Sequence, residues 1–221
     1  MNWAPLVLSL EVAALATLVS LLLALALAWI LSFLDFKGKE FLDAVITLPL
    51  VLPPTVLGYY LLVLLGRESW VGNAFERLTG SPLVFTWKAA VIAAIIHSAP
   101  LLTKYLRASI ESVDAVYIKA ARSLGISEWK IYWRVVLPLC QRGIAAAGVL
   151  AFARSLGDFG VTIMIAGNIP NKTQTVSVAI YEAVEAGNST LALTLVLIVS
   201  AIGLSVVWIA NRLNPPQAWR S

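Results

Sequence analysis

Five apolar stretches, separated by short charged segments, dominate the hydrophobic pattern of the chain. A helix needs about 20 apolar residues to cross about 30 Å of hydrocarbon, and this length sets the span assignments. The third stretch is short between its flanking charges, but Lys88 and Lys104 can extend to the interfaces and lengthen it. We therefore predict an all-α, polytopic membrane protein of one domain over residues 1–221, with about five transmembrane helices. The predicted spans are residues 10–34, 43–66, 86–106, 143–167 and 189–211.

Composition supports a fold whose solvent is mostly lipid, because 60% of the 221 residues are hydrophobic and only 13% are charged. A single cysteine, Cys140, excludes a disulfide framework within the chain. A single histidine, His97, excludes a histidine metal cluster. We expect no cofactor or metal in this chain and no nucleic-acid partner. The net charge of +4 is instead interpreted through membrane orientation.

The basic residues lie mainly on one side of the predicted spans. Of the 16 lysines and arginines, eleven lie in the loops after the first and third spans and in the tail, where Arg220 is the last of them. Three lie on the opposite side: Arg67, Arg77 and Lys172. Because basic residues are retained in the cytoplasm, we place the N-terminus outside and the C-terminus inside. The loop at residues 107–142 is then cytoplasmic.

This loop contains the pattern of a helix, a turn and a second helix. Asp114 is a typical N-cap, Gly125 a typical C-terminal glycine, and Ser127 can cap the second helix. An apolar stripe at spacings of three and four runs along the first helix, and it consists of Val116, Tyr117, Ala120, Ala121 and Leu124. The stripe fits a helix that inserts into a partner's groove, and it equally fits a helix that rests on the membrane surface.

The run from Lys119 to Pro138, KAARSLGISEWKIYWRVVLP, resembles the EAA motif of the membrane subunits of ABC importers. In that motif, Glu-Ala-Ala is followed by a glycine, an apolar residue and Leu-Pro. Lys119 stands where the motif has glutamate, so no role of that acid carries over. In the family, this segment contacts the ATPase. The resemblance therefore implies a coupling role for Tyr117, Lys119, Ala120, Ala121, Leu124, Gly125, Leu137 and Pro138.

Residues 41–60 and 152–175 resemble the molybdate permeases of that family, so the likeness covers nearly the whole chain. Sulfate, thiosulfate and tungstate permeases share the pattern. The resemblance implies a homodimeric type I ABC importer fold in a bacterial or archaeal cytoplasmic membrane. It also implies three kinds of partner: a second copy, a cytoplasmic ATPase dimer that binds ATP and Mg²⁺, and a periplasmic or lipid-anchored oxyanion-binding protein.

Other function classes fit the sequence less well. The chain has no G-x-x-x-x-G-K-[ST] phosphate loop, so we expect a non-catalytic transport subunit. An ATP-independent channel or secondary transporter would need carboxylates at mid-membrane, where only Asp158 and Glu11 are available. An intramembrane enzyme would have to use His97 with Asp158. We interpret the isolated His97 as a packing residue, because no other titratable group is near it in sequence.

The membrane residues suggest where a passage could run. Pro49, Pro53 and Pro54 must kink or break the second span, either as pathway lining or as a static kink. Arg154 and Asp158 are four residues apart, so we expect a structural ion pair, with direct anion contact as the alternative. The candidate pathway residues are Thr47, Pro53, Pro54, Thr55, Ser98, Arg154 and Asp158.

Overall fold

Helices make up most of residues 2–213, the part of the chain that the computed structural model describes. Met1 and residues 214–221 lie outside the described residues. They include Arg220, one of the eleven basic residues that the sequence places on the cytoplasmic side. No strand occurs among residues 2–213, which confirms the predicted all-α class. The helices are α1 (Ala4–Phe33), α2 (Lys39–Val51), α3 (Pro54–Leu65), α4 (Trp70–Thr79), α5 (Trp87–Glu111), α6 (Ala115–Ser123), α7 (Glu128–Ile131), the π-helix η1 (Tyr132–Val136), α8 (Leu137–Leu156), α9 (Gly160–Ile165), α10 (Val176–Glu185) and α11 (Ser189–Leu213).

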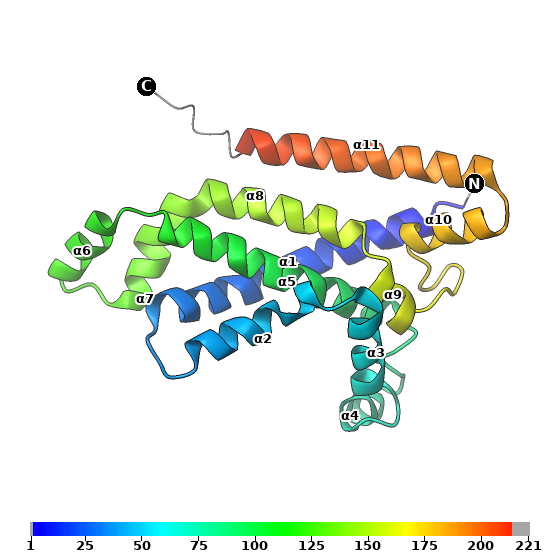
Figure 1. Cartoon of the computed structure of the whole chain (residues 1–221), viewed down its shortest axis with the longest axis horizontal. Coiled ribbons are helices and arrows are strands. Elements are labelled where there is room, and N and C mark those ends of the chain that lie inside the picture. The colour runs from blue at the N-terminus through cyan, green and yellow to red at the C-terminus, as the bar shows by residue number, and fades with distance from the viewer. Residues whose placement is uncertain (1, 214–221) are drawn as a thin grey trace.

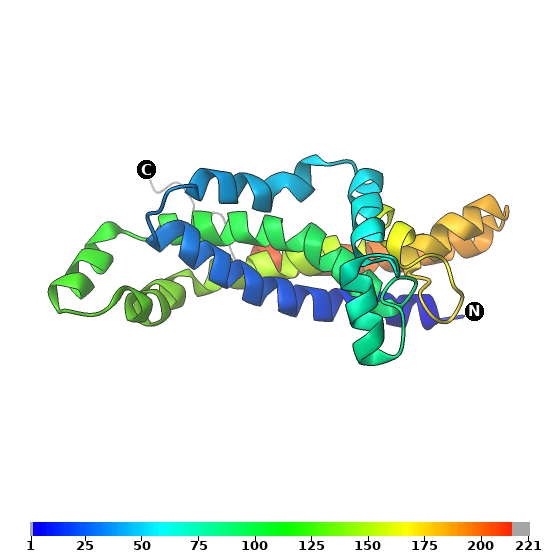
Figure 2. The ribbon, with the colours of Figure 1, turned by 90° about the horizontal axis from the view of Figure 1, so that it is seen from below.

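Four long helices, α1, α5, α8 and α11, run along the long axis of the molecule, and neighbours among them pack side by side (Figure 1). Short helices gather at the two ends. Helices α6 and α7 lie at one end, and α3, α4, α9 and α10 lie at the other (Figures 1 and 2). The chain begins at the second end, and α11 returns it toward the first (Figure 1). With α7 and η1 counted as part of the α8 span, all four are long and apolar enough to cross a membrane.

The second predicted span is broken rather than straight. Its two halves, α2 and α3, meet at an angle of 112°. The break follows from Pro53 and Pro54, because proline removes a backbone donor and disfavours helix in the residue before it. The 13 residues of α2 extend only about 20 Å, which is too short to cross a bilayer alone. The chain therefore has up to five spans, with the bent pair as the fifth.

The range 143–167, predicted as one span, contains most of α8 and the whole of α9. Helix α8 continues directly from η1 and α7, so the helical run begins at Glu128 and ends at Leu156. This run has 29 residues, or about 44 Å. It therefore begins inside residues 107–142, the segment predicted to be a cytoplasmic loop. Beyond Leu156 the chain leaves the helix at Gly157 and starts again with α9.

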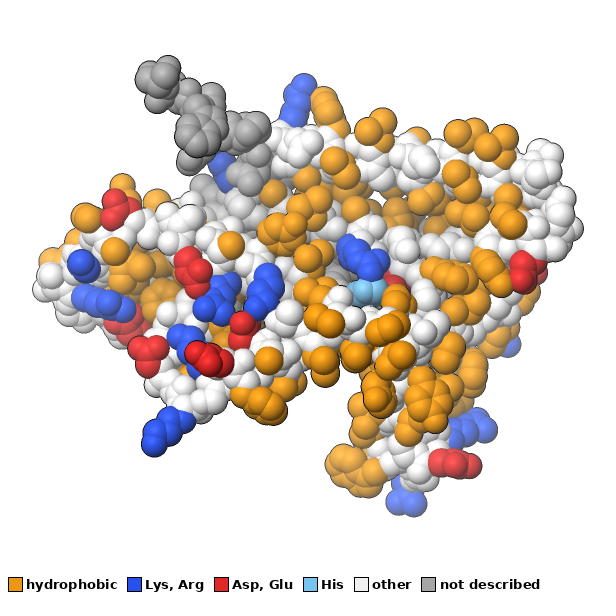
Figure 3. Space-filling model, in the orientation of Figure 1, with side chains coloured by type: hydrophobic (Ala, Val, Ile, Leu, Met, Phe, Trp, Pro, Cys, Tyr) orange, Lys and Arg blue, Asp and Glu red, His pale blue; other side chains and the backbone are white. Residues whose placement is uncertain are grey.

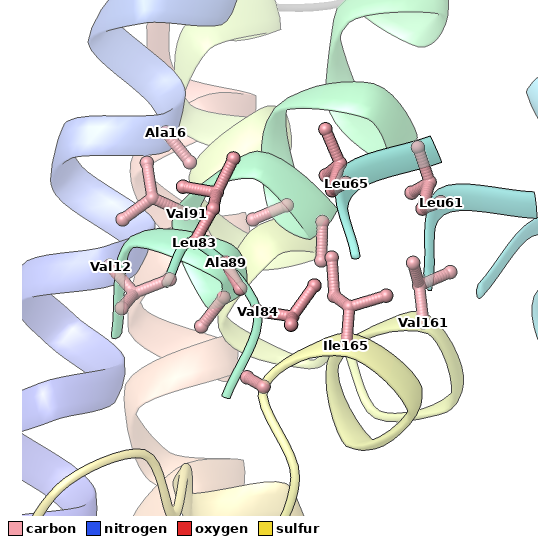
Figure 4. Packing of buried hydrophobic residues seen from close by; sticks show 14 of the residues in the cluster. Val12, Ala16, Leu61, Leu65, Leu83, Val84, Ala89, Val91, Val161 and Ile165 are labelled. Carbon is pink, nitrogen blue, oxygen red and sulfur yellow. The ribbon is translucent and has the colours of Figure 1, made fainter. Parts of the chain in front are cut away.

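Among residues 2–213, three apolar clusters form the core, and the two larger ones lie toward opposite ends of the long helices. The outer cluster joins α1, α3, α5 and α9, and Figure 4 shows Val12, Leu61, Val91 and Ile165 among its members. The inner cluster joins α1, α5, α6, α7, η1 and α8. Helices α3 and α9 approach closely in the outer cluster. A Cβ atom on Gly58 would lie 2.6 Å from the Cβ of Met164, so no larger residue fits there without movement.

Between the two clusters, polar side chains occupy the middle of the long helices. On α1, Ser20 separates the outer residue Ala16 from the inner residue Ala24. On α5, His97 and Ser98 lie between Ala94 and Leu102 in the same way. Where α8 gives way to α9, Arg154 and Asp158 separate Ala151 of the inner cluster from Val161 of the outer one. We call Ser20, His97, Ser98, Arg154 and Asp158 the polar layer.

Candidate functional site

The segment between α5 and α8 folds into the helical hairpin that the sequence predicts. Asp114 caps α6 by accepting a hydrogen bond from the backbone N–H of Val116 at 2.9 Å. Gly125 follows the helix with a φ of +73°, a left-handed conformation that glycine adopts at little cost. Ser127 precedes α7, although its side chain makes no cap hydrogen bond. The helix-turn-helix prediction is thus confirmed, and we call residues 114–131 the inner hairpin.

The apolar stripe of α6 is divided between a buried and an exposed side. Ala121 packs into the inner cluster. In contrast, the side chain of Leu124 is 78% exposed and that of Tyr117 is 55% exposed. Ala120 and Lys119 are exposed as well. The inner hairpin lies at one extremity of the molecule (Figure 1), so this uncovered apolar surface is well placed to meet a partner.

An ion pair holds the two arms of the inner hairpin together. Arg122 donates two hydrogen bonds to the carboxylate of Glu128, from Nε at 2.7 Å and from Nη2 at 3.0 Å. The hydrogen bond and the negative charge of Glu128 raise the pKa of Arg122 above its ordinary value.

The remaining predicted coupling residues lie beyond the hairpin, where Leu137 is buried at the start of α8 and Pro138 is exposed.

Aromatic side chains connect the inner hairpin to α1. The ring of Trp129 meets that of Trp29 edge to face, with centroids 5.0 Å apart. The Tyr132 ring packs against Phe33, and its hydroxyl donates to the backbone carbonyl of Leu25 at 2.8 Å. The π-helix carries Tyr132, and π-helical turns are frequent at functional sites. The inner hairpin is therefore in contact with α1 through Trp129 and is continuous with α8 through η1.

In the polar layer, His97 lies between the two charged residues of the predicted ion pair. Its Nδ1 is 2.9 Å from Oδ1 of Asp158, and its ring also contacts Nη2 of Arg154. The other carboxylate oxygen of Asp158 accepts a hydrogen bond from Thr162 Oγ1 at 2.6 Å. Among residues 2–213, no direct ion pair joins Arg154 to Asp158. The reason is that α8 ends at Leu156, so the two residues do not share a helix face.

The other predicted pathway residues are distributed over two places. Thr47 lies on α2 and hydrogen-bonds to the carbonyl of Asp43, while Pro53, Pro54 and Thr55 are exposed at the bend. The bend packs against the start of α9, two residues after Asp158, because a Cβ atom on Gly160 would lie 2.6 Å from the Cβ of Pro54.

Ser98 is buried between α5 and α1, where its hydroxyl meets that of Ser20 at 2.8 Å. It therefore lies within the packing of these two helices. The structure thus places Pro54 against Gly160 at the start of α9, whereas Ser98 joins two helices.

Sequence reasoning missed the role of His97 as the bridge. His97 is 61 residues from Asp158 along the chain, and no local pattern connects them. The aromatic cluster was missed too, although the sequence Trp-Lys-Ile-Tyr-Trp at residues 129–133 is a usable signal. Three aromatic residues within five positions at a membrane interface are typical of an anchored helix.

Comparison with known proteins identifies relatives over most of the chain. Residues 17–217 match the family described as "Binding-protein-dependent transport system inner membrane component". The molybdenum transport system permease protein ModB of Escherichia coli K12 is 44% identical over 184 residues, which cover 83% of this chain and 80% of that protein. The chloroplastic sulfate permease 2 of Chlamydomonas reinhardtii is 32% identical over 187 residues, covering 85% of this chain and 50% of that protein.

A solved structure shares the fold. A chain of a bacterial ABC transporter involved in the import of the acidic polysaccharide alginate superposes with a TM-score of 0.75, covering 95% of this chain and 77% of the other. The two sequences are only 16% identical, so the likeness concerns the fold alone.

Proposed function

Because the chain belongs to the family of binding-protein-dependent transport system inner membrane components, we propose that it is the non-catalytic membrane subunit of an ATP-driven importer and that it translocates molybdate. The observation that carries the choice of anion is the 44% identity with the molybdenum permease ModB over 184 residues. Sulfate is the second candidate, because a sulfate permease is 32% identical over 187 residues.

A second copy of the chain is the first proposed partner. No residue of α2 is buried, and on α3 the side chains of Tyr59, Tyr60 and Val63 are 58%, 60% and 58% exposed. Five spans enclose little space by themselves, whereas two copies related by a twofold axis present the same face to each other. Dimerisation through the α2–α3 face would cover these side chains and enclose a passage next to the polar layer.

The two ends of the molecule suit the other two partners. The exposed side of the inner hairpin, with Tyr117 and Leu124, would dock on a cytoplasmic ATPase dimer that binds ATP and Mg²⁺. The opposite end, built from α4, α10 and the loop before α10, would receive the oxyanion-loaded binding protein (Figure 1). This assignment places the N-terminus outside the cytoplasm and the end of α11 inside it. Lipid would cover the remaining apolar faces of the spans.

The proposed mechanism couples ATPase closure to a change of access. Closure of the two ATPase subunits would move the inner hairpin, and the contact of Trp129 with Trp29 would carry that movement to α1. The unbroken helix from Glu128 to Leu156 would carry it to the polar layer. The spans would then rock from inward-open to outward-open and accept the anion from the binding protein.

Reconstitution tests this function directly. The chain is purified with its ATPase and binding protein, inserted into liposomes, and assayed for molybdate uptake with ATP or with a non-hydrolysable analogue. We expect uptake only with hydrolysable ATP, with strong competition from tungstate and weak competition from sulfate. Equal uptake without hydrolysis would refute the proposed function. Sulfate competition as strong as that of tungstate would favour the sulfate alternative.

A further inference from the structure

The polar layer places a guanidinium group halfway along the membrane helices, on a face that the chain leaves open. Arg154 is partly exposed and lies between the inner and outer clusters. Figure 3 shows the one histidine in the middle of this face, with basic and acidic atoms beside it and mainly apolar side chains around it. A charge at this depth is costly in lipid. This part of the face therefore adjoins protein or water.

Most of the hydrogen-bonding capacity of Arg154 is unused. A guanidinium group has five N–H donors. Only Nη2 of Arg154 contacts an acceptor, the imidazole ring of His97, and within residues 2–213 no other hydrogen bond leaves this side chain. The remaining donors can hold a planar or tetrahedral oxyanion in the forked geometry that arginine provides.

The partners of Arg154 leave its positive charge available. Arginine can only donate, so the imidazole nitrogen that faces it must accept, and the Nδ1–H of His97 is then donated to Asp158. Asp158 is only 4% exposed and already accepts hydrogen bonds from His97 and Thr162. The negative charge of Asp158 is therefore directed into the helix packing, and the positive charge of Arg154 is directed toward the open face.

We propose that Arg154 is the anion-contact residue of the passage and that His97, oriented by Asp158, is the residue that positions it. This inference rests on the proposed function. In a twofold-symmetric pair of chains, two Arg154 side chains face one passage, so their two charges match one tetrahedral dianion. Each chain contributes only one arginine to the polar layer, so the contact is weak enough to release the anion.

The experiment measures how many anions are transported for each ATP hydrolysed. The full complex, with ATPase and binding protein, is reconstituted with wild-type chain or with one of three variants: Arg154→Gln, Arg154→Lys and, as a matched control, Arg212→Gln. Arg212 is also on a long apolar helix, but it lies at the end of α11, where it stacks on Trp208 at 4.1 Å and is not part of the polar layer. Molybdate uptake and phosphate release are recorded on the same vesicles, and assembly is checked by gel filtration.

The expected results separate anion contact from a structural role. Arg154→Gln should hydrolyse ATP at a normal rate but transport about tenfold fewer anions per ATP, because charge-assisted hydrogen bonds are lost. Arg154→Lys, which keeps the charge without the fork, should transport about threefold fewer. Arg212→Gln should match the wild type. An unchanged ratio in Arg154→Gln overturns the inference. Where that variant does not assemble, an unchanged ratio in Arg154→Lys overturns it.

Failure of the proposed function gives a different result. A wild-type complex that takes up neither molybdate nor sulfate with ATP refutes the function and, with it, the anion contact. A wild-type complex that transports normally, beside an Arg154→Gln complex with the same anions per ATP, refutes only the anion contact. The positioning role of His97 has its own readout. His97→Leu should lower the ratio about as far as Arg154→Lys does, and His97→Gln, which restores an acceptor for Arg154, should recover it.

Discussion

Replacement of Leu124 by aspartate is expected to leave the membrane domain folded and to abolish ATP-driven uptake. The Leu124 side chain is 78% exposed at the tip of the inner hairpin, so the substitution removes little packing within the chain. In the assembled importer, the same side chain would be buried in an ATPase groove, where a carboxylate carries a large desolvation cost. Anchor residues at interfaces contribute 2 kcal/mol or more, so binding of the ATPase should weaken by at least about 30-fold.

The measurement is co-purification of the ATPase with the Leu124→Asp chain, together with uptake in vesicles. Leu78→Asp is the matched control, because Leu78 is a comparably exposed leucine (86%) on α4, at the opposite end of the molecule. The control chain should retain its ATPase. Normal ATPase binding and uptake by Leu124→Asp would show that the inner hairpin has a different role.

Replacement of Asp158 by alanine is expected to cause the largest loss of stability. The Asp158 carboxylate is 4% exposed and accepts hydrogen bonds from both His97 and Thr162. Its removal leaves these donors without an acceptor and removes the counter-charge of Arg154. Breaking a buried charged network by deleting one member costs about 3 kcal/mol, which corresponds to a fall of about 6–12 °C in melting temperature for a chain of this size.

Thermal unfolding in detergent measures this effect. Asp158→Asn keeps the shape and one acceptor, so it should lose roughly a third as much stability. Asp35→Ala is the surface control, because Asp35 is fully exposed and forms only a 3.3 Å pair with Lys39. Exposed pairs contribute about 0–1 kcal/mol, so this control should unfold near the wild-type temperature. An Asp158→Ala chain as stable as the Asp35→Ala chain would mean that the polar layer does not hold the helices together.

Features that depend on neighbours in sequence were predictable. The inner hairpin follows from the N-cap at Asp114 and the left-handed glycine at 125, because capping involves residues only a few positions apart. The break of the second span follows from Pro53 and Pro54, because a proline affects only its own position and those next to it. The four long apolar helices followed from hydropathy, because lipid forces each crossing to satisfy its backbone hydrogen bonds internally.

Features that depend on tertiary contact were not predictable from the sequence. Helical spacing suggested a direct pair between Arg154 and Asp158, but the helix ends at Leu156 and His97 takes the intermediate position. Nothing local indicates this, because His97 comes from another helix. The start of the second hairpin helix after Ser127 was predicted, but its unbroken continuation into the fourth span was missed, because the predicted loop at residues 107–142 separated the two.

Site-directed crosslinking gives the most direct examination of the inner hairpin as the point where an ATPase drives the spans. The native Cys140 is buried and is replaced by serine, and a single reactive thiol is introduced by Leu124→Cys. We expect this thiol to crosslink to the ATPase in the assembled complex, with a yield that changes between the ATP-bound and nucleotide-free states. A thiol that never reaches the ATPase and is modified instead by a lipid-embedded reagent would contradict the coupling role.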